Sequence, residues 1–105
     1  MKGALAMEYD SKFKSQVMDE FFEAVLLLKD LDDCYRFFED VCTINELRAM
    51  TQRMQVAKLL ADKKTYSEIE ELTKASTATI SRINKCLVYG AGGYELVIER
   101  LKEKE

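Results

Sequence analysis

The 105-residue sequence contains no histidine, no proline and no tryptophan. Histidine is the commonest general base and metal ligand, so its absence argues against Ser-His-Asp or Cys-His catalysis and against most zinc hydrolase sites. The adjacent carboxylates, such as Asp32-Asp33 and Glu70-Glu71, are typical of solvated faces and helix caps, because neighbouring helical residues point about 100° apart. We therefore expect a protein that is not an enzyme and that uses neither a cofactor nor a metal.

Long apolar runs and paired cysteines are also lacking. The longest unbroken apolar run, Ala24–Leu28, is far shorter than the roughly 20 residues of a membrane span, so we expect no membrane partner and a cytoplasmic location. Cys34, Cys42 and Cys86 contain no C-x-x-C pair and are expected to be buried, reduced thiols. The first six residues are too short for a signal peptide, and Met7 is a second candidate start. We therefore expect them to lie outside a single domain at residues 7–105.

Glycine and proline are absent between Ala4 and Tyr89, so hairpin turns lack their usual residues there. This absence predicts an all-α fold. Thr43-Ile-Asn-Glu46 and Thr65-Tyr-Ser-Glu68 match the S/T-x-x-E capping box that begins a helix, and Asp32-Asp33 indicates a third helix start. The sequence predicts six helices, at about 11–29, 33–42, 44–62, 66–73, 77–89 and 94–103.

The first three predicted helices are unusually rich in apolar residues. From Phe13 to Leu60, 26 of 48 residues are apolar, which is dense for helices with one wet face. A well-filled monomeric core is one explanation. We prefer an obligate homodimer in which helices at about 11–62 pack across a two-fold axis, since such interfaces resemble a domain core cut in half.

Acidic residues are absent from Leu72 to Tyr94, although the whole chain has a net charge of -3. Lys74, Arg82 and Lys85 give this window a charge of +3, so the other 13 basic and 19 acidic residues sum to -6. Exclusion of acidic residues is typical of an element that faces phosphate. The alternative is chance combined with a helix buried by its neighbours.

Within this window, the predicted helix at 77–89 follows a short predicted helix at 66–73, and the turn Lys74-Ala75-Ser76 separates the two helices. Two short helices joined in this way predict a helix-turn-helix at about 66–89, whose second helix enters the DNA major groove. Lys74 stands where many such turns carry glycine, so we expect a left-handed lysine. At about 100° per residue, one face of the second helix carries the apolar residues expected to pack on Ile69 and Leu72. These apolar residues are Ile80, Ile83 and Leu87.

The opposite face and the start of the second helix hold the candidate contacts to double-stranded DNA. Arg82 and Lys85 can reach phosphate or guanine. The hydroxyls at the helix start can cap the helix and favour a bound phosphate, although capping alone and a plain solvated Ser81 are the alternatives. The complete set of candidates is Ser76, Thr77, Ala78, Ser81, Arg82 and Lys85.

The run Ser76-Thr-Ala-Thr-Ile-Ser-Arg82, with the long preceding helix Thr43–Asp62, resembles the Trp repressor superfamily. The closer likeness is to its short TrpR-like branch, the YerC/YecD-type proteins. It covers about Met7 to Leu101 and implies an intertwined, all-helical homodimer that binds operator DNA as a transcriptional regulator. The segments that carry the closer likeness are Lys64-Thr-Tyr66, Ala75–Ile83, Cys86-Leu87 and Tyr89-Gly90.

The resemblance also bears on a small-molecule effector. In the Trp repressor, two arginines hold tryptophan beside a glycine and a serine; the resemblance implies Arg82 as one arginine and sets Arg53 near the other. Here Ile83 replaces the glycine and Cys86 replaces the serine. A branched side chain fills the space of an indole, and a thiol is a poor acceptor. We therefore predict no tryptophan co-repressor, while another effector stays open.

A protein-interaction module on the same helix-turn-helix scaffold is the alternative function, with the acidic remainder of the chain as its docking surface. Salt dependence separates the two functions, because counterion release makes DNA binding fall steeply as salt rises.

Overall fold

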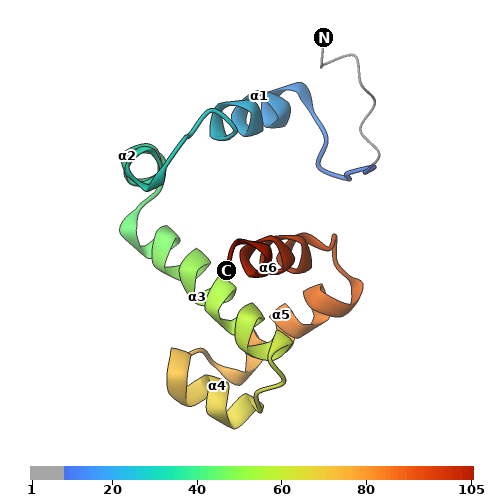
Figure 1. The fold of residues 1–105 in the computed structure, drawn as a ribbon. Helices are drawn as coiled ribbons and strands as arrows, with labels where there is room; N and C mark the ends of the chain where they lie inside the picture. The colour runs from blue at the N-terminus through green and yellow to red at the C-terminus, as the bar shows by residue number, and fades with distance from the viewer. Residues whose placement is uncertain (1–8) are drawn as a thin grey trace. The chain divides into compact units, whose positions relative to one another are not determined.

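The computed structural model describes residues 9–105, and this part of the chain is all-helical, with six helices and no strand (Figure 1). The all-α, six-helix prediction is therefore confirmed. The expectation about residues 1–6 falls outside the described residues. The helices are α1 (Gln16–Val25), α2 (Leu31–Val41), α3 (Ile44–Ala61), α4 (Tyr66–Thr73), α5 (Thr77–Tyr89) and α6 (Gly93–Lys104).

Two capping boxes begin α3 and α4 where the sequence predicts them. The Thr43 hydroxyl accepts from the Glu46 N–H at 3.1 Å, and the Glu46 carboxylate accepts from the Thr43 N–H at 2.8 Å. Thr65 and Glu68 repeat this arrangement at the same two distances. Each box satisfies two backbone donors that a helix start otherwise leaves free.

The first helix is shorter than predicted, because a serine caps it. The Ser15 hydroxyl accepts from the Met18 N–H at 3.1 Å, so α1 begins at Gln16 rather than near residue 11. It ends at Val25 rather than near residue 29, and the chain then forms turns up to residue 28. Apolar spacing alone does not reveal this end, since the apolar stripe continues into the turns.

The second helix begins two residues earlier than predicted. The Asp30 carboxylate accepts from the Asp33 N–H at 2.9 Å and so caps the helix that starts at Leu31. Asp33 in turn accepts from the Lys29 N–H at 3.0 Å. The Asp32-Asp33 pair therefore lies in the first turn rather than before it, where negative charge still favours the helix dipole.

The described chain divides into two compact units after Val41. The core lies in the second unit, residues 42–105, where α3 contacts α4, α5 and α6. Burying each large aliphatic side chain of this kind contributes about 1.5–3 kcal/mol. The buried residues come from α3, α4, the turn before α5, α5 itself and α6; they are Val56, Ala57, Ile69, Ala75, Ile80, Ile83 and Ile98.

The first unit contains no buried residue in either of its helices. Phe21 of α1 and Phe37 of α2 approach each other, with ring centroids 5.9 Å apart, and Phe38 stacks edge-on against Phe37 at 5.2 Å. Most other apolar side chains of α1 and α2 face solvent in a single copy of the chain. A large apolar surface therefore surrounds this small aromatic cluster.

The cysteines differ from the prediction of buried thiols. Cys34 and Cys42 are half-buried, and Cys86 is exposed. Cys86 lies three positions after the buried Ile83, yet its side chain is exposed. No helix within residues 9–105 has the length and apolar content needed to cross a membrane.

Candidate nucleic-acid interface

The turn between α4 and α5 has the geometry of a helix-turn-helix. Lys74 adopts the left-handed conformation with φ 62°, as predicted, and its N–H donates to the Glu70 carbonyl at 2.8 Å. Ala75 is buried, and Ser76 caps α5 by accepting from the Thr79 N–H at 3.1 Å. The three-residue turn and both flanking helices therefore match the sequence prediction.

Two polar residues outside the predicted set hold this turn in place. The Thr73 hydroxyl donates to the Ile69 carbonyl at 2.8 Å and accepts from the Ala75 N–H at 3.2 Å. Gln52 of α3 donates its side-chain amide to the Thr73 carbonyl at 3.0 Å. These bonds join the end of α4 to α3, and no local sequence pattern identifies the long-range partner Gln52.

The inner face of α5 is apolar and buried, as the helical spacing predicts. Ile80 and Ile83 are 0% and 4% exposed, and Leu87 is half-buried. Ile69 of α4 is buried with them, but Leu72 is 64% exposed and does not join this core. The expected contact with Leu72 is therefore wrong. The short helix α4 turns Leu72 toward α3, where it lines a 330 Å³ hollow with Gln55 and Leu59.

The outer face of α5 carries the predicted DNA contacts, and all of them are exposed. Among residues 9–105 the ion pairs join Lys14 to Asp19 and Arg36 to Asp32, so neither cation of this face is committed to a carboxylate. The face has no acidic residue of its own, because the segment from 72 to 94 contains none. The exposed candidates are Ser76, Thr77, Ala78, Ser81, Arg82 and Lys85.

The hydroxyls at the start of α5 are already engaged in hydrogen bonds. Ser76 accepts from the backbone as described and also donates to the Thr79 hydroxyl at 3.1 Å. Thr77 donates its hydroxyl to the Glu70 carboxylate of α4. Sequence reasoning missed Glu70, which is half-buried beside the candidate contacts. Ser76 thus has the capping role, whereas Arg82, Lys85 and the first helical turn offer donors to an incoming anion.

A tyrosine near the start of α6 lies close to Arg53, one of the two arginines that the resemblance singles out. Tyr94 packs against the core, and burial raises the pKa of its phenol; the neighbouring Cys86 raises this pKa further, while Arg53 opposes it. The Tyr94 phenol is therefore neutral at pH 7 and lies close to both Cys86 and Arg53. The sequence pattern did not single out Tyr94.

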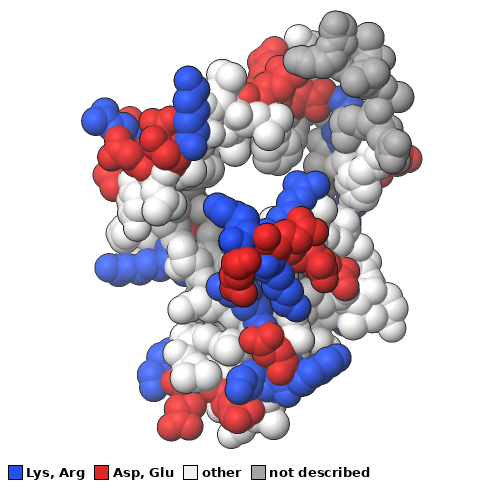
Figure 2. Space-filling view, in the orientation of Figure 1, with Lys and Arg blue, Asp and Glu red and all other residues white. Residues whose placement is uncertain are grey.

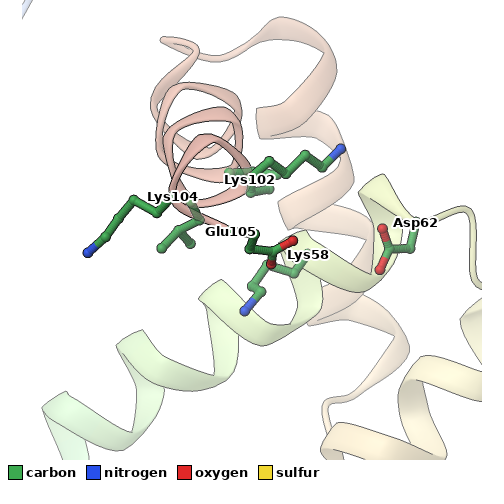
Figure 3. Close-up of a pocket in the computed structure, with 7 residues that line it drawn as sticks. Lys58, Asp62, Lys102, Lys104 and Glu105 are labelled. Carbon is green, nitrogen blue, oxygen red and sulfur yellow. The ribbon is translucent and has the colours of Figure 1, made fainter.

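Charge is mixed on one face of the molecule (Figure 2). Figure 2 shows one face, on which basic and acidic side chains alternate over α2, α4 and α6. A 520 Å³ pocket between α3 and α6 has the same mixed character (Figure 3). Lys102 and Lys104 extend from its rim in opposite directions, and Asp62 adds a negative charge. The pocket is therefore a poor match for a ligand of one charge sign, and its lining contains no residue of α5.

The comparison with known proteins agrees with this geometry. The family model described as Trp repressor protein matches residues 16–102. The chain belongs to the Trp repressor family. It is 50% identical to YerC, an uncharacterized protein of Bacillus subtilis (strain 168). The 94 aligned residues cover 90% of each of the two chains. The YerC-type resemblance inferred from the sequence is therefore confirmed.

Solved structures of this family share the fold. A TrpR-like protein from Eubacterium eligens superposes with a TM-score of 0.84 at 55% identity, over 89% of this chain and 96% of the other. A protein from Staphylococcus aureus gives the same TM-score at 40% identity, over 92% and 96% of the two chains. The all-α Trp-repressor-like fold is thus shared along nearly the whole chain.

Proposed function

We propose that this protein is a homodimeric, sequence-specific DNA-binding transcriptional regulator, repressor-like, that acts in the cytoplasm through its helix-turn-helix. The observation that supports this function most is the two-sided character of α5: Ile80 and Ile83 are buried, whereas the six candidate contacts are exposed and free of acidic neighbours within the helix. The Trp repressor family is regulatory rather than enzymatic, which agrees with this function.

In the proposed complex, α5 lies in the major groove of double-stranded DNA. Ala78 and Ser81 are small, so they allow the helix to approach the base edges closely. Arg82 and Lys85 contact phosphate or guanine, and the start of α5 presents its free N–H groups to a phosphate. Only two cations lie on the exposed face of α5, which predicts modest affinity or contacts mediated by water.

Dimerisation is supported by the apolar side chains that α1 and α2 leave exposed. A second copy of the chain that packs across these helices covers them, as obligate interfaces do. The dimer also brings two α5 helices to successive major grooves, about 34 Å apart. The most exposed large apolar side chains of α1 and α2 are Val17 (77%), Phe22 (55%), Leu31 (77%) and Tyr35 (67%), and the segments that flank α1 add Phe13 (66%), Leu26 (81%) and Leu27 (76%).

We propose further that tryptophan is not the co-repressor. Ile83 is 4% exposed and fills core space on α5, and Cys86 offers only a weak acceptor. Tyr94 lies near enough to Cys86 and Arg53 for both to shift the pKa of its phenol. Calorimetric titration with L-tryptophan is expected to give no binding heat, and saturable binding would contradict this part of the proposal.

The experiment that tests the proposed interface is a DNA titration with alanine variants. Arg82→Ala is expected to cost about 1–3 kcal/mol and to relax sequence preference if Arg82 reads guanine. If Arg82 contacts phosphate, the loss is uniform across sequences and the salt slope falls by about 1. Lys85→Ala should also weaken binding. Lys102→Ala removes the same charge from α6, outside the interface, and is the matched control.

The outcomes separate the two candidate functions. Loss of binding in the α5 variants but not in the control supports DNA recognition by α5. An equal loss in all three variants points to a general charge effect and contradicts the interface. Absence of DNA binding by the wild type even at about 50 mM salt favours the protein-interaction alternative.

A further inference from the structure

The candidate interface contains one engaged carboxylate that is not part of α5. Glu70 lies on α4, and its carboxylate accepts from the hydroxyl of Thr77, the first residue of α5. Thr77 is exposed and Glu70 is half-buried. A negative charge is therefore held against the start of the helix that the proposed function places in the groove.

This carboxylate occupies a position that favours anions. The start of an α-helix carries free N–H groups and the positive end of the helix dipole, so it attracts a carboxylate or a phosphate. The next acidic residue after Glu71 is Glu95, well beyond α5. Glu70 and Glu71 are the last two acidic residues before α5, and of these two Glu70 is the one bonded to the interface.

We infer that Glu70 is an anionic gate on the DNA interface, an inference that rests on the proposed function. Its carboxylate takes the place of a phosphate at Thr77, and an approaching phosphate must displace it against like-charge repulsion. Sequence-independent binding, which depends on phosphate contacts, is weakened most. The gate therefore lowers the affinity for any duplex that brings a phosphate to Thr77.

Glu70 also has a structural contact, and the test has to separate the two roles. Its backbone carbonyl accepts from the Lys74 N–H at 2.8 Å, which supports the turn. Glu70→Gln leaves this backbone bond intact and retains a side-chain oxygen that can accept from Thr77. The substitution therefore removes the charge and preserves the acceptor.

The experiment measures dissociation constants of the full chain for an unrelated random-sequence duplex between about 50 and 200 mM salt. Glu70→Gln is expected to bind more tightly than the wild type. Removing one repelling charge adds up to about 0.9 to the salt slope, so the advantage should be about threefold larger at the lower salt. Glu70→Lys should change affinity further in the same direction, and it keeps the test decisive if Glu70→Gln is unstable.

Glu71→Gln is the matched control, because it removes the same charge from the next residue of α4. Equal effects of Glu70→Gln and Glu71→Gln on the dissociation constant would show that net charge alone sets the change in affinity, and would overturn the gate. Unchanged or weaker binding by Glu70→Gln, with wild-type binding intact, would overturn the gate but leave the proposed function standing. No binding by the wild type or by either Glu70 variant would instead overturn the proposed function, and the gate with it.

Discussion

Arg82 and Ile83 are consecutive residues of α5 with opposite surroundings: Arg82 is exposed, whereas Ile83 is 4% exposed in the core. Consecutive helical side chains point about 100° apart, so one residue step crosses from the packed face to the free face. The same helix can thus be fixed by its apolar side while presenting cations on the other. The proposed DNA contact by α5 depends on this division.

The buried face of α5 is expected to stabilise the fold. Ile80→Ala removes a fully buried side chain and should lower the free energy of unfolding by about 2–5 kcal/mol, through lost burial and a residual cavity. Urea unfolding measures this loss. Val88→Ala, at a side chain that is 61% exposed in the same helix, is the control and should change stability by about 0.5 kcal/mol or less. Similar losses in both variants would contradict the packing described here.

The long-range bond from Gln52 to Thr73 gives a second prediction. Gln52→Glu replaces the amide donor by a carboxylate that faces the Thr73 carbonyl, so it should cost about 1–3 kcal/mol of stability. Thermal or urea unfolding at neutral pH measures the cost. Gln55→Glu makes the same change at an exposed position of α3 and should be nearly neutral. Equal stability of the two variants would show that the bond adds nothing.

The capping box of α4 predicts a pH dependence. Hydrogen bonds from the Thr65 N–H and hydroxyl lower the pKa of the Glu68 carboxyl below its ordinary value of 4.5, with a smaller contribution from Lys64. A group whose pKa is lower in the folded state stabilises the fold above its unfolded pKa. This contribution disappears as pH falls through the folded pKa.

The Glu68 contribution is measured with a neutral variant. Glu68→Gln should be less stable than the wild type at pH 7, and the difference should shrink as pH falls below about 4.5. Urea unfolding across this range provides the measurement. Glu71→Gln is the control for the loss of one charge from α4. A stability difference between Glu68→Gln and wild type that is independent of pH would rule out the capping carboxylate as its source.

The proposed dimer is tested at α1. Phe22 is 55% exposed in the single chain, and Phe22→Glu places a charge in the apolar surface expected to meet a second copy. Sedimentation should give a dimer for the wild type and a monomer, or a strongly weakened dimer, for the variant. Glu23→Gln, which changes an exposed polar neighbour, should leave the dimer intact. A monomeric wild type at micromolar concentration would contradict the dimer.

The sequence predicts the second half of the fold better than the first. The bounds of α4 and α5 match because a capping box and a capping serine define their starts locally. The start of α2 was misplaced because several aspartates are adjacent there and the capping role falls to Asp30. Local sequence shows which residue types can cap, but the folded backbone decides which of several neighbours does so.

The candidate interface shows the same division between local and long-range information. The exposed set on α5 follows from helical periodicity, which needs only the order of residues. The bonds from Thr77 to Glu70 and from Gln52 to Thr73 join different helices, so they depend on how these helices pack. The same holds for Leu72: the sequence predicts its helical face, but the neighbour that it faces depends on how α4 packs.

Selection of binding sites from a random duplex pool tests the central claim most directly. The wild-type protein should enrich a palindromic sequence whose half-sites lie about one helical turn apart, because two α5 helices read successive major grooves. Arg82→Ala should relax that consensus if Arg82 reads guanine, or enrich it less strongly if Arg82 contacts phosphate, whereas Lys102→Ala should match the wild type. No enriched sequence at about 50 mM salt, or an Arg82→Ala variant that equals the wild type in both consensus and strength of enrichment, would contradict DNA recognition by this face of α5.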